Sequence, residues 1–256
     1  KVACSEAEKW PDAGIQVRQE WLGTGASFAA VQGIQGPQSE GKHMSDKYEV
    51  TDRTTLTRRP HRGIYNKDAI RAILDEGFMC NVAYVHEGAP RVLPTGYGRI
   101  GDYIYIHGSN QSTMLSAALS GEVCVLVTHV DGLVLARSLY NHSVNYRSVV
   151  VLGRPEEVTD PEEKLASFEA YARHVLKGRF ADVRPPNSKE LNSTTVMRIP
   201  IVEAVAKMRS GPPTDFEFDL DRDCWAGELL IKQVFAGAIR DPQGRQDGPV
   251  PRDIGV

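Results

Sequence analysis

Residues 89–119 read APRVLPTGYGRIGDYIYIHGSNQSTMLSAAL, two strand patterns followed directly by a polar helix start. Period-two alternation places five side chains on one face of the first strand: Arg91, Leu93, Thr95, Tyr97 and Arg99. After a turn at Gly101-Asp102, the second strand has a polar-aromatic face, made by Tyr103, Tyr105 and His107, and an apolar face. This pattern is typical of a half-buried strand beside a ligand, and equally of an ordinary edge strand.

Residues 108–113, GSNQST, lead into a helix predicted over residues 114–119. Free backbone N–H groups at a helix start, together with serine and threonine hydroxyls, bind phosphate well. A Ser109 or Ser112 that only caps the helix explains the same residues. The pattern therefore leaves two interpretations open, a phosphate site and a plain N-cap.

The composition describes one ordinary domain with a sizeable core, or one domain with an appendage: 256 residues, 41% apolar content and a net charge of −3. No run approaches the roughly 18 apolar residues of a membrane helix, and the N-terminus lacks the apolar core of a signal peptide. We therefore expect a cytoplasmic protein that binds neither nucleic acid nor membrane. The four cysteines are widely separated, so we expect no metal site and no disulfide framework.

The chain is predicted to have three parts. Residues 1–47 carry little periodicity beyond a short helix near residues 15–22, and His43-Met44 resembles a cloning junction. We expect this part to be poorly structured, either as a native extension or as a leader from cloning. The main domain is expected over residues 48–239. The Gly-, Pro- and Asp-rich residues 240–256 are expected to form a flexible tail.

Strand patterns alternate with a few helices along the main domain. The helices are expected at residues 66–77, capped by Asn66, at residues 161–176, and within PPNSKEL. Strands are expected at 78–85, 122–130, 133–139, 146–153 and 194–201, the last taken as the final barrel strand. Asp131-Gly132 is the strongest hairpin signal. Six or seven antiparallel strands with inserted helices favour a small β-barrel.

Two arginines interrupt apolar strand faces. Arg137 shares a face with Leu133 and Leu135, and Arg147 precedes two valines on its face. A buried guanidinium needs a partner, which is either a structural carboxylate or an anionic ligand. No dinucleotide-binding glycine motif, phosphate-binding P-loop or hydrolase motif accompanies them.

Six ordered segments between residues 54 and 231 resemble the pyridoxamine 5'-phosphate oxidase-like family of flavin-nucleotide-binding proteins, nearest to its nitroimidazole-resistance branch. They read TRRPHRGIYNKDAIRAILDEGFMCNVAYV, YIYIHGS, DGLVLARSLYNHSVNYRSVVVLGRPEEV, PPNSKELNSTTVMRIPI, AKMRSGPP and CWAGELLI. The resemblance implies a mainly antiparallel FMN-binding split β-barrel, in a homodimer with the cofactor at the subunit interface. Some family members bind haem or a deazaflavin instead.

The resemblance implies an FMN-dependent oxidoreductase that passes electrons or hydride from a reduced nicotinamide nucleotide or deazaflavin to a small, nitroaromatic or other nitrogen-containing, acceptor. A non-catalytic flavin-nucleotide-binding protein would have nearly the same sequence, because the flavin itself supplies the redox chemistry. A third interpretation is haem binding or degradation through His107 or His142. The visible spectrum separates flavin from haem, and reduction by a nicotinamide nucleotide separates enzyme from binding protein.

The resemblance also suggests site residues. The flavin ring is expected against Pro94, Thr95, Tyr97 and His107, with His107 as the catalytic residue, and Trp225 is expected to complete the ring pocket. The phosphate is expected at Gly108, Ser109, Ser112 and Thr113. Many family members have a cation at this helix start, which this sequence lacks. We therefore expect Arg147 to supply the charge, with Arg137 second. Arg91 and Arg99 are competitors by position, and Arg58, Arg59 and Arg62 are set aside as a basic segment near Pro60.

Overall fold

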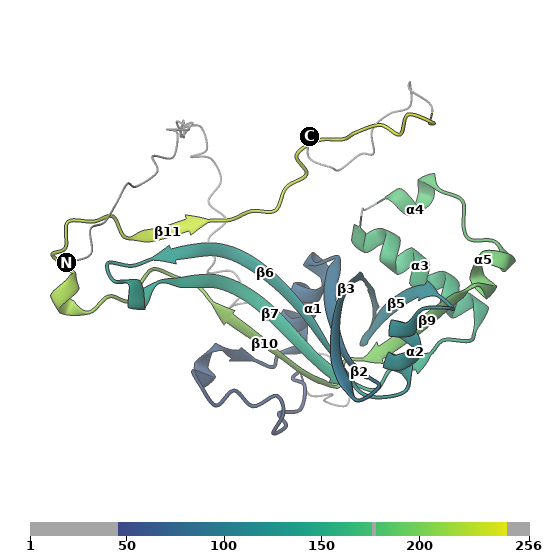
Figure 1. Ribbon diagram of the computed structural model, residues 1–256, viewed down its shortest axis with the longest axis horizontal. Helices are drawn as coiled ribbons and strands as arrows, with labels where there is room; N and C mark the ends of the chain where they lie inside the picture. Colours follow the sequence, from purple (N-terminus) through teal and green to yellow (C-terminus); the bar gives the residue numbers. More distant parts are fainter. Residues whose placement is uncertain (1–45, 176–177, 245–256) are drawn as a thin grey trace, which may run out of the picture. The chain divides into compact units, whose positions relative to one another are not determined.

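The computed structural model describes residues 46–175 and 178–244 (Figure 1). The short helix and the junction expected in residues 1–47 lie outside these ranges, as does the tail from residue 245 onward. Described residues 240–244 of the tail contain no helix or strand.

Two antiparallel sheets organise the described chain, as the sequence predicts. The larger sheet has the strand order β1 (Gly63–Ile64), β10 (Glu203–Arg209), β7 (Ser143–Gly153), β6 (Val123–Leu135), β2 (Met79–His86) and β3 (Ala89–Gly96), with β11 (Gly227–Leu230) also on β6. The smaller sheet has the order β4 (Gly98–Ile100), β5 (Tyr103–Ser109), β9 (Thr194–Pro200) and β8 (Glu156–Glu157). The sheets do not close into one barrel, and the architecture is that of a split barrel.

Helices fill the connections between these strands. They are α1 (Lys67–Glu76), α2 (Thr113–Leu119), α3 (Pro161–Val175), α4 (Arg179–Asp182) and α5 (Ser188–Asn192), with short 3-10 turns η2 (Pro60–Arg62), η3 (Leu139–Asn141) and η4 (Glu217–Asp219). The helices predicted at residues 66–77, at 161–176 and in PPNSKEL are thus confirmed.

The two faces of β5 pack into different cores, which follows from its alternating sequence. Ile104 and Ile106 are fully buried in the main core with the valines of β6 and β7. Tyr105, on the opposite face, belongs to a smaller core that includes Phe168 of α3. Helix α3 therefore covers the polar-aromatic face of β5.

Helix α1 is fixed at both ends by side-chain hydrogen bonds. The Asn66 side chain accepts a hydrogen bond from the Ala69 N–H at 2.9 Å, as expected for an N-cap. The last turn of a helix leaves carbonyl groups without helical partners. Here the Tyr97 hydroxyl donates to the Leu74 carbonyl, and His129 Nε2 lies 3.0 Å from the Ile73 carbonyl. The link between β3 and β4 and the strand β6 thereby close the end of α1.

The single strand expected over residues 91–99 is wrong, because the chain changes sheets at Tyr97. Strand β3 pairs with β2, whereas β4 pairs with β5 in the other sheet. The two glycines that flank Tyr97 allow α3 to approach this corner. A Cβ on Gly98 would lie 2.7 Å from the Tyr171 backbone nitrogen, and one on Gly96 would overlap the Tyr171 ring.

The hairpin expected at Asp131-Gly132 is also wrong. Strand β6 runs through both residues, with a β-bulge between Val130 and Gly132, and the chain reverses only at η3. Gly132 is required for a different reason: a Cβ there would lie 2.8 Å from the carbonyl oxygen of Leu229 in β11. Gly132 therefore leaves room for the backbone of β11, and the Asp131-Gly132 pair does not form a turn.

Strands β10 and β11 follow residues 194–201, which the sequence predicts as the last barrel strand. Strand β10 lies between β1 and β7, and its consecutive residues Ala204, Val205 and Ala206 are all buried. Because both of its faces are covered, it lacks the alternation on which the prediction relied.

Candidate functional site

The predicted flavin-ring residues differ in how far they are exposed. Pro94 is exposed and Thr95 half-buried at the end of β3, while Tyr97 is fully buried beneath α1. Burial raises the pKa of the Tyr97 hydroxyl, which is therefore neutral. Helix α3 packs against two of these positions and Gly96, because Tyr171 lies against Gly96 and the His107 ring, and His174 lies edge-on to Tyr97.

His107 lies beneath helix α3. Its ring centroid is 4.6 Å from that of Phe168 and 5.0 Å from that of Tyr171, the latter in an edge-on arrangement. Burial lowers the pKa of His107, so its imidazole is neutral near pH 7. Its predicted catalytic role stays a prediction, but the ring has a clear packing role.

The predicted phosphate loop is a capped helix start. The Ser112 hydroxyl accepts a hydrogen bond from the Leu115 N–H at 3.3 Å, and the Ser109 hydroxyl accepts one from the Gln111 N–H at 3.2 Å. Thr113 opens α2, and Gly108 is the second-last residue of β5. The N-cap interpretation of Ser112 is confirmed, and phosphate binding at this loop remains untested.

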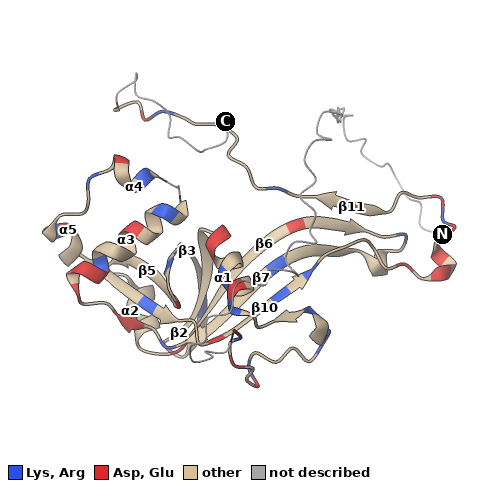
Figure 2. Cartoon of the chain, turned by 180° about the vertical axis from the view of Figure 1, so that it is seen from behind, with Lys and Arg blue, Asp and Glu red and all other residues tan. Residues whose placement is uncertain are grey.

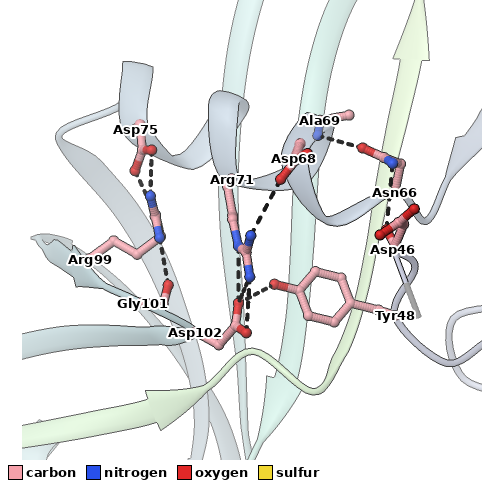
Figure 3. Close-up of polar contacts among 10 residues, drawn as sticks. All are labelled: Asp46, Tyr48, Asn66, Asp68, Ala69, Arg71, Asp75, Arg99, Gly101 and Asp102. Atoms are coloured by element: carbon pink, nitrogen blue, oxygen red, sulfur yellow. Dashed lines mark hydrogen bonds and ion pairs between the residues drawn. The ribbon is translucent and has the colours of Figure 1, made fainter. Parts of the chain in front are cut away.

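The arginines assigned to the phosphate already have carboxylate partners. Arg147 binds Glu76 and Asp131, the latter at 2.8 Å. Arg137 binds Asp215 at 2.9 Å. Arg99 forms a two-pronged contact with Asp75, as Figure 3 shows beside the Arg71–Asp102 pair. These carboxylates offset the positive charge that a phosphate would need.

Trp225 is available for a ligand. It is 62% exposed and lies just before β11. A Cβ on Gly227 would lie 3.0 Å from its ring, so the indole rests on the glycine backbone. The exposed aromatic face agrees with the predicted ring pocket but does not test it.

A different group of cations lines a cleft of about 600 Å³, here called the basic cleft. Its basic residues are Arg58, Arg59, Arg62, Lys207 and Arg209, and its wall also includes Tyr140, Asn141 and Phe216. The pairing of Gly63 with Lys207 brings the arginine segment beside β10. Figure 2 shows basic positions on β10 and on the segment around η2 next to it.

The charge in the basic cleft is poorly compensated. Among the described residues that line it, none is acidic. Arg209 donates to neutral oxygens, including the Gly211 carbonyl at 2.8 Å and the Asn145 side chain. Burial lowers the pKa of Arg209, and repulsion from Arg62 and Arg59 lowers it further, while Glu228 opposes the shift. An anion in the cleft would relieve this repulsion.

The end of the β6–β7 hairpin supplies further unused donors beside the cleft. Asn141 Nδ2 is buried without a hydrogen-bond partner and belongs to the cleft wall. Arg137 Nε and Ser138 Oγ, a few residues earlier, are also buried and unpaired. Buried polar groups are normally paired, so donors of this kind fit a bound acceptor.

Three aromatic rings form a stack at the same place. The Tyr140 and Phe216 centroids are 6.1 Å apart with an interplanar angle of 21°, and those of Phe216 and Phe218 are 5.2 Å apart at 12°. Tyr140 is 83% exposed and Phe218 is 79% exposed. The stack therefore offers flat aromatic surface next to a concentration of positive charge.

The basic cleft was not predicted from the sequence. Its signal was present in TRRPHRG, which holds three arginines within five residues and no acidic residue. The partners Lys207 and Arg209 lie almost 150 residues later, and only the β1–β10 pairing brings them close. Arg59 also has φ 57° and ψ 59°, a left-handed conformation that costs a non-glycine residue about 1–2 kcal/mol.

A second cavity, of about 800 Å³, has Arg147 in its wall and is here called the histidine cavity. It is lined by His129 and His174 and by apolar side chains such as Phe78, Val234 and Phe235. Charged side chains also line it: Glu76, Asp131, Arg147 and Lys232. His174 Nδ1 lies 3.1 Å from the Tyr97 carbonyl, and His129 is held by the Ile73 carbonyl. Each imidazole thus has one ring nitrogen bound to the backbone.

Within the described residues, no helix is long and apolar enough to cross a membrane. Nor does this part of the chain contain a group of three or more His, Cys, Asp or Glu residues that could hold a metal ion.

Comparisons with known proteins agree with this architecture. The flavocytochrome Anf3 from Azotobacter vinelandii is 36% identical, with a TM-score of 0.74 over 80% of this chain and 95% of its own. The FAD and haem binding protein from Mycobacterium smegmatis is 30% identical, with a TM-score of 0.71 over 75% of this chain and 94% of its own. A proposed 5-nitroimidazole antibiotic resistance protein from Bacteroides thetaiotaomicron VPI-5482 is 23% identical, with a TM-score of 0.49 over 57% of this chain and 85% of its own.

A search of curated proteins found no match. The family model described as pyridoxamine 5'-phosphate oxidase matches residues 66–208, which is more than half of the chain. Together with the antiparallel split barrel and the extended similarity to two solved structures, this match assigns the protein to the pyridoxamine 5'-phosphate oxidase-like family.

Proposed function

We propose that this protein is an oxidoreductase that uses a flavin nucleotide, with the phosphate-bearing end of the cofactor in the basic cleft. The observation that carries the proposal is the set of five cations with no acidic residue in the described cleft wall. The unpaired Asn141 donor and the aromatic stack add groups that suit a phosphate and a flat ring. Two relatives of at least 30% identity are named as a flavocytochrome and an FAD and haem binding protein.

The chain's own residues bind and orient in this proposal. When bound, the flavin supplies the electron or hydride transfer, and the protein sets its position and surroundings. FMN is the cofactor expected from the sequence, a reduced nicotinamide nucleotide the electron donor, and a small nitrogen-containing molecule the acceptor. Ser112, Thr113 and Arg147, which the sequence predicts as phosphate contacts, remain the alternative phosphate site, and Trp225 remains a proposed contact of the flavin ring.

We further propose a cytoplasmic homodimer in which the second subunit completes the flavin pocket. Strand β3 supports this view, because Val92 and Leu93 point to opposite faces and are 61% and 44% exposed. Exposed apolar side chains of this kind are typical of an interface between subunits. Sedimentation of the purified protein measures the assembly directly.

The cofactor is identified by the visible spectrum of the purified protein after incubation with FMN, FAD or haem. We expect flavin absorption bands that remain after desalting and that bleach when a reduced nicotinamide nucleotide is added without oxygen. A stable flavin that no nicotinamide nucleotide reduces would point to the non-catalytic binding protein. Absence of retained flavin under every condition would contradict the proposal.

Haem is the second candidate cofactor, because the histidine cavity combines two imidazoles with apolar side chains on part of its wall. Histidines that bind metal commonly donate their other ring N–H to a backbone carbonyl, as His174 and His129 are placed to do. An intense Soret band of haem in the same spectrum, lost in His174→Ala or His129→Ala, would establish this alternative. It would exclude a haem role for His107 and His142.

The catalytic role proposed for His107 is tested by turnover per bound flavin. We expect His107→Ala to lower this ratio at least tenfold, since a positioned proton-transfer group typically contributes 10²–10⁴-fold. The variant also opens space beneath Phe168 and Tyr171, so Phe168→Ala is the matched control for disturbed packing. Equal turnover per flavin in His107→Ala and the wild type would leave His107 with a packing role alone.

A further inference from the structure

The number of cations in the basic cleft exceeds what one phosphate group uses. A phosphate monoester carries about −1.5 to −2 charges at pH 7 and three acceptor oxygens. Four guanidiniums and one ammonium line the cleft. Each guanidinium alone has five N–H donors. The cleft thus has the charge and the donors for two linked phosphates.

The cations also come from separate segments of the chain. Arg58, Arg59 and Arg62 surround η2, whereas Lys207 and Arg209 lie on β10, two residues apart and thus on the same face of the strand. A volume of about 600 Å³ gives a diphosphate space between these two sides. Arg209 is fixed by the Gly211 carbonyl and by the Pro212 carbonyl at 3.1 Å, so at least one of the cations is held in place before a ligand arrives.

The aromatic stack adds a surface for a heterocyclic base. Phe216 lines the cleft and lies in the middle of the stack, 45% exposed, while Tyr140 also borders the cleft. Bases stack on aromatic side chains without requiring specific hydrogen bonds. In a ligand that joins a base to a diphosphate, the diphosphate would contact the cations and the base would stack on Tyr140 or Phe216.

We infer that the basic cleft binds the adenosine diphosphate half of a dinucleotide, with the diphosphate between η2 and β10 and the adenine on the Tyr140–Phe216 stack. This inference rests on the proposed flavin function, and it replaces the FMN expected from the sequence with a dinucleotide as the occupant of the basic cleft. The same chemistry occurs in FAD and in nicotinamide dinucleotides. The cleft is therefore either the cofactor's adenosine end or the docking site of the electron donor.

Calorimetric titration of the full chain with ADP and with inorganic pyrophosphate tests the site without any redox reaction. We expect ADP to bind, and pyrophosphate to bind more weakly. Arg62→Gln and Lys207→Gln should each weaken ADP about tenfold, since a charge-assisted hydrogen bond of ordinary strength corresponds to that factor. Arg173→Gln, which removes an exposed arginine on α3, is the matched control and should change nothing.

The Phe216→Leu variant distinguishes the contribution of the base to ADP affinity from that of the phosphates. This variant should weaken ADP binding several-fold and leave pyrophosphate binding unchanged. Failure of ADP to bind, or an equal response of the cleft variants and the Arg173→Gln control, would overturn the inference. An equal loss of ADP and pyrophosphate in Phe216→Leu would refute the stacked adenine.

Competition identifies the source of the adenosine diphosphate. The titration is made on protein freed of bound flavin and again after flavin is restored: ADP binding that is lost when FAD is restored assigns the cleft to the flavin cofactor, and ADP binding that persists with flavin bound and is displaced by NADPH assigns it to the electron donor. Displacement by FMN as effectively as by FAD would overturn the inference in favour of a mononucleotide. Flavin absorption, measured on the same samples, reports separately on the proposed function: flavin that is retained by a protein whose flavin-free form does not bind ADP contradicts only the inference.

Discussion

Replacing Tyr97 with alanine should lower the free energy of unfolding by about 3–5 kcal/mol, the range found for large aromatic side chains removed from protein cores. The side chain has no exposed surface, and its ring lies edge-on to His174 at a centroid distance of 5.0 Å. It also joins the two sheets at their corner and closes the end of α1 through the Leu74 carbonyl. Truncation therefore removes packing and a helix cap together.

Denaturant unfolding followed by circular dichroism measures this loss. Tyr97→Phe keeps the ring and leaves the Leu74 carbonyl without its donor, so it should cost about 1–3 kcal/mol. Tyr140→Ala is the control, because Tyr140 is 83% exposed and its removal should change stability by no more than about 0.5 kcal/mol. A loss below about 1 kcal/mol in Tyr97→Ala would show that the corner between the sheets does not depend on this residue.

Arg147→Ala should destabilise the protein by about 1–3 kcal/mol at pH 7, because it leaves Glu76 and Asp131 without their shared partner. The guanidinium is 20% exposed, so solvent only partly replaces it. The ion pair joins the end of α1 to the bulge in β6. Arg173→Ala, which breaks an exposed pair within α3, should cost about 0.5 kcal/mol or less.

The effect of Arg147→Ala should depend on pH. The Arg147 guanidinium lowers the pKa of Glu76 below its usual value. A carboxyl group with a lowered pKa stabilises the folded state above its unfolded pKa, about 4.3, and this contribution disappears as the pH falls through the folded pKa. The stability difference between the wild type and Arg147→Ala should therefore be full at pH 7 and shrink below about pH 4. A difference that does not change with pH would contradict the pairing with Glu76.

The same variant tests the phosphate contact predicted from the sequence. If Arg147 contacts the phosphate, Arg147→Ala lowers the preference for FMN over riboflavin, and Ser112→Ala does the same. If Arg147 only joins α1 to the sheet, the preference stays at the wild-type value. Glu76→Gln is the matched control, since it disturbs the ion pair and leaves the guanidinium in place.

The sequence by itself determined the local structure of this protein. Asn66 caps α1, and the alternation in YIYIHG directs the isoleucines of β5 into the main core. These features depend on neighbours only a few residues away, so a sequence pattern contains all the information they need. The ordered family segments extended this knowledge to the split barrel.

Only the tertiary structure decided where the charges are balanced. Arg147 and Glu76 are 71 residues apart, and the basic cleft joins Arg62 to Lys207 through the β1–β10 pairing. It also decided why glycine is required at two positions: Gly98 leaves room for the backbone of α3, and Gly132 leaves room for β11. A sequence pattern shows that a charge or a glycine is present, but its partner depends on which distant segments pack together. That selection is made by burial of the whole core, which no short segment determines alone.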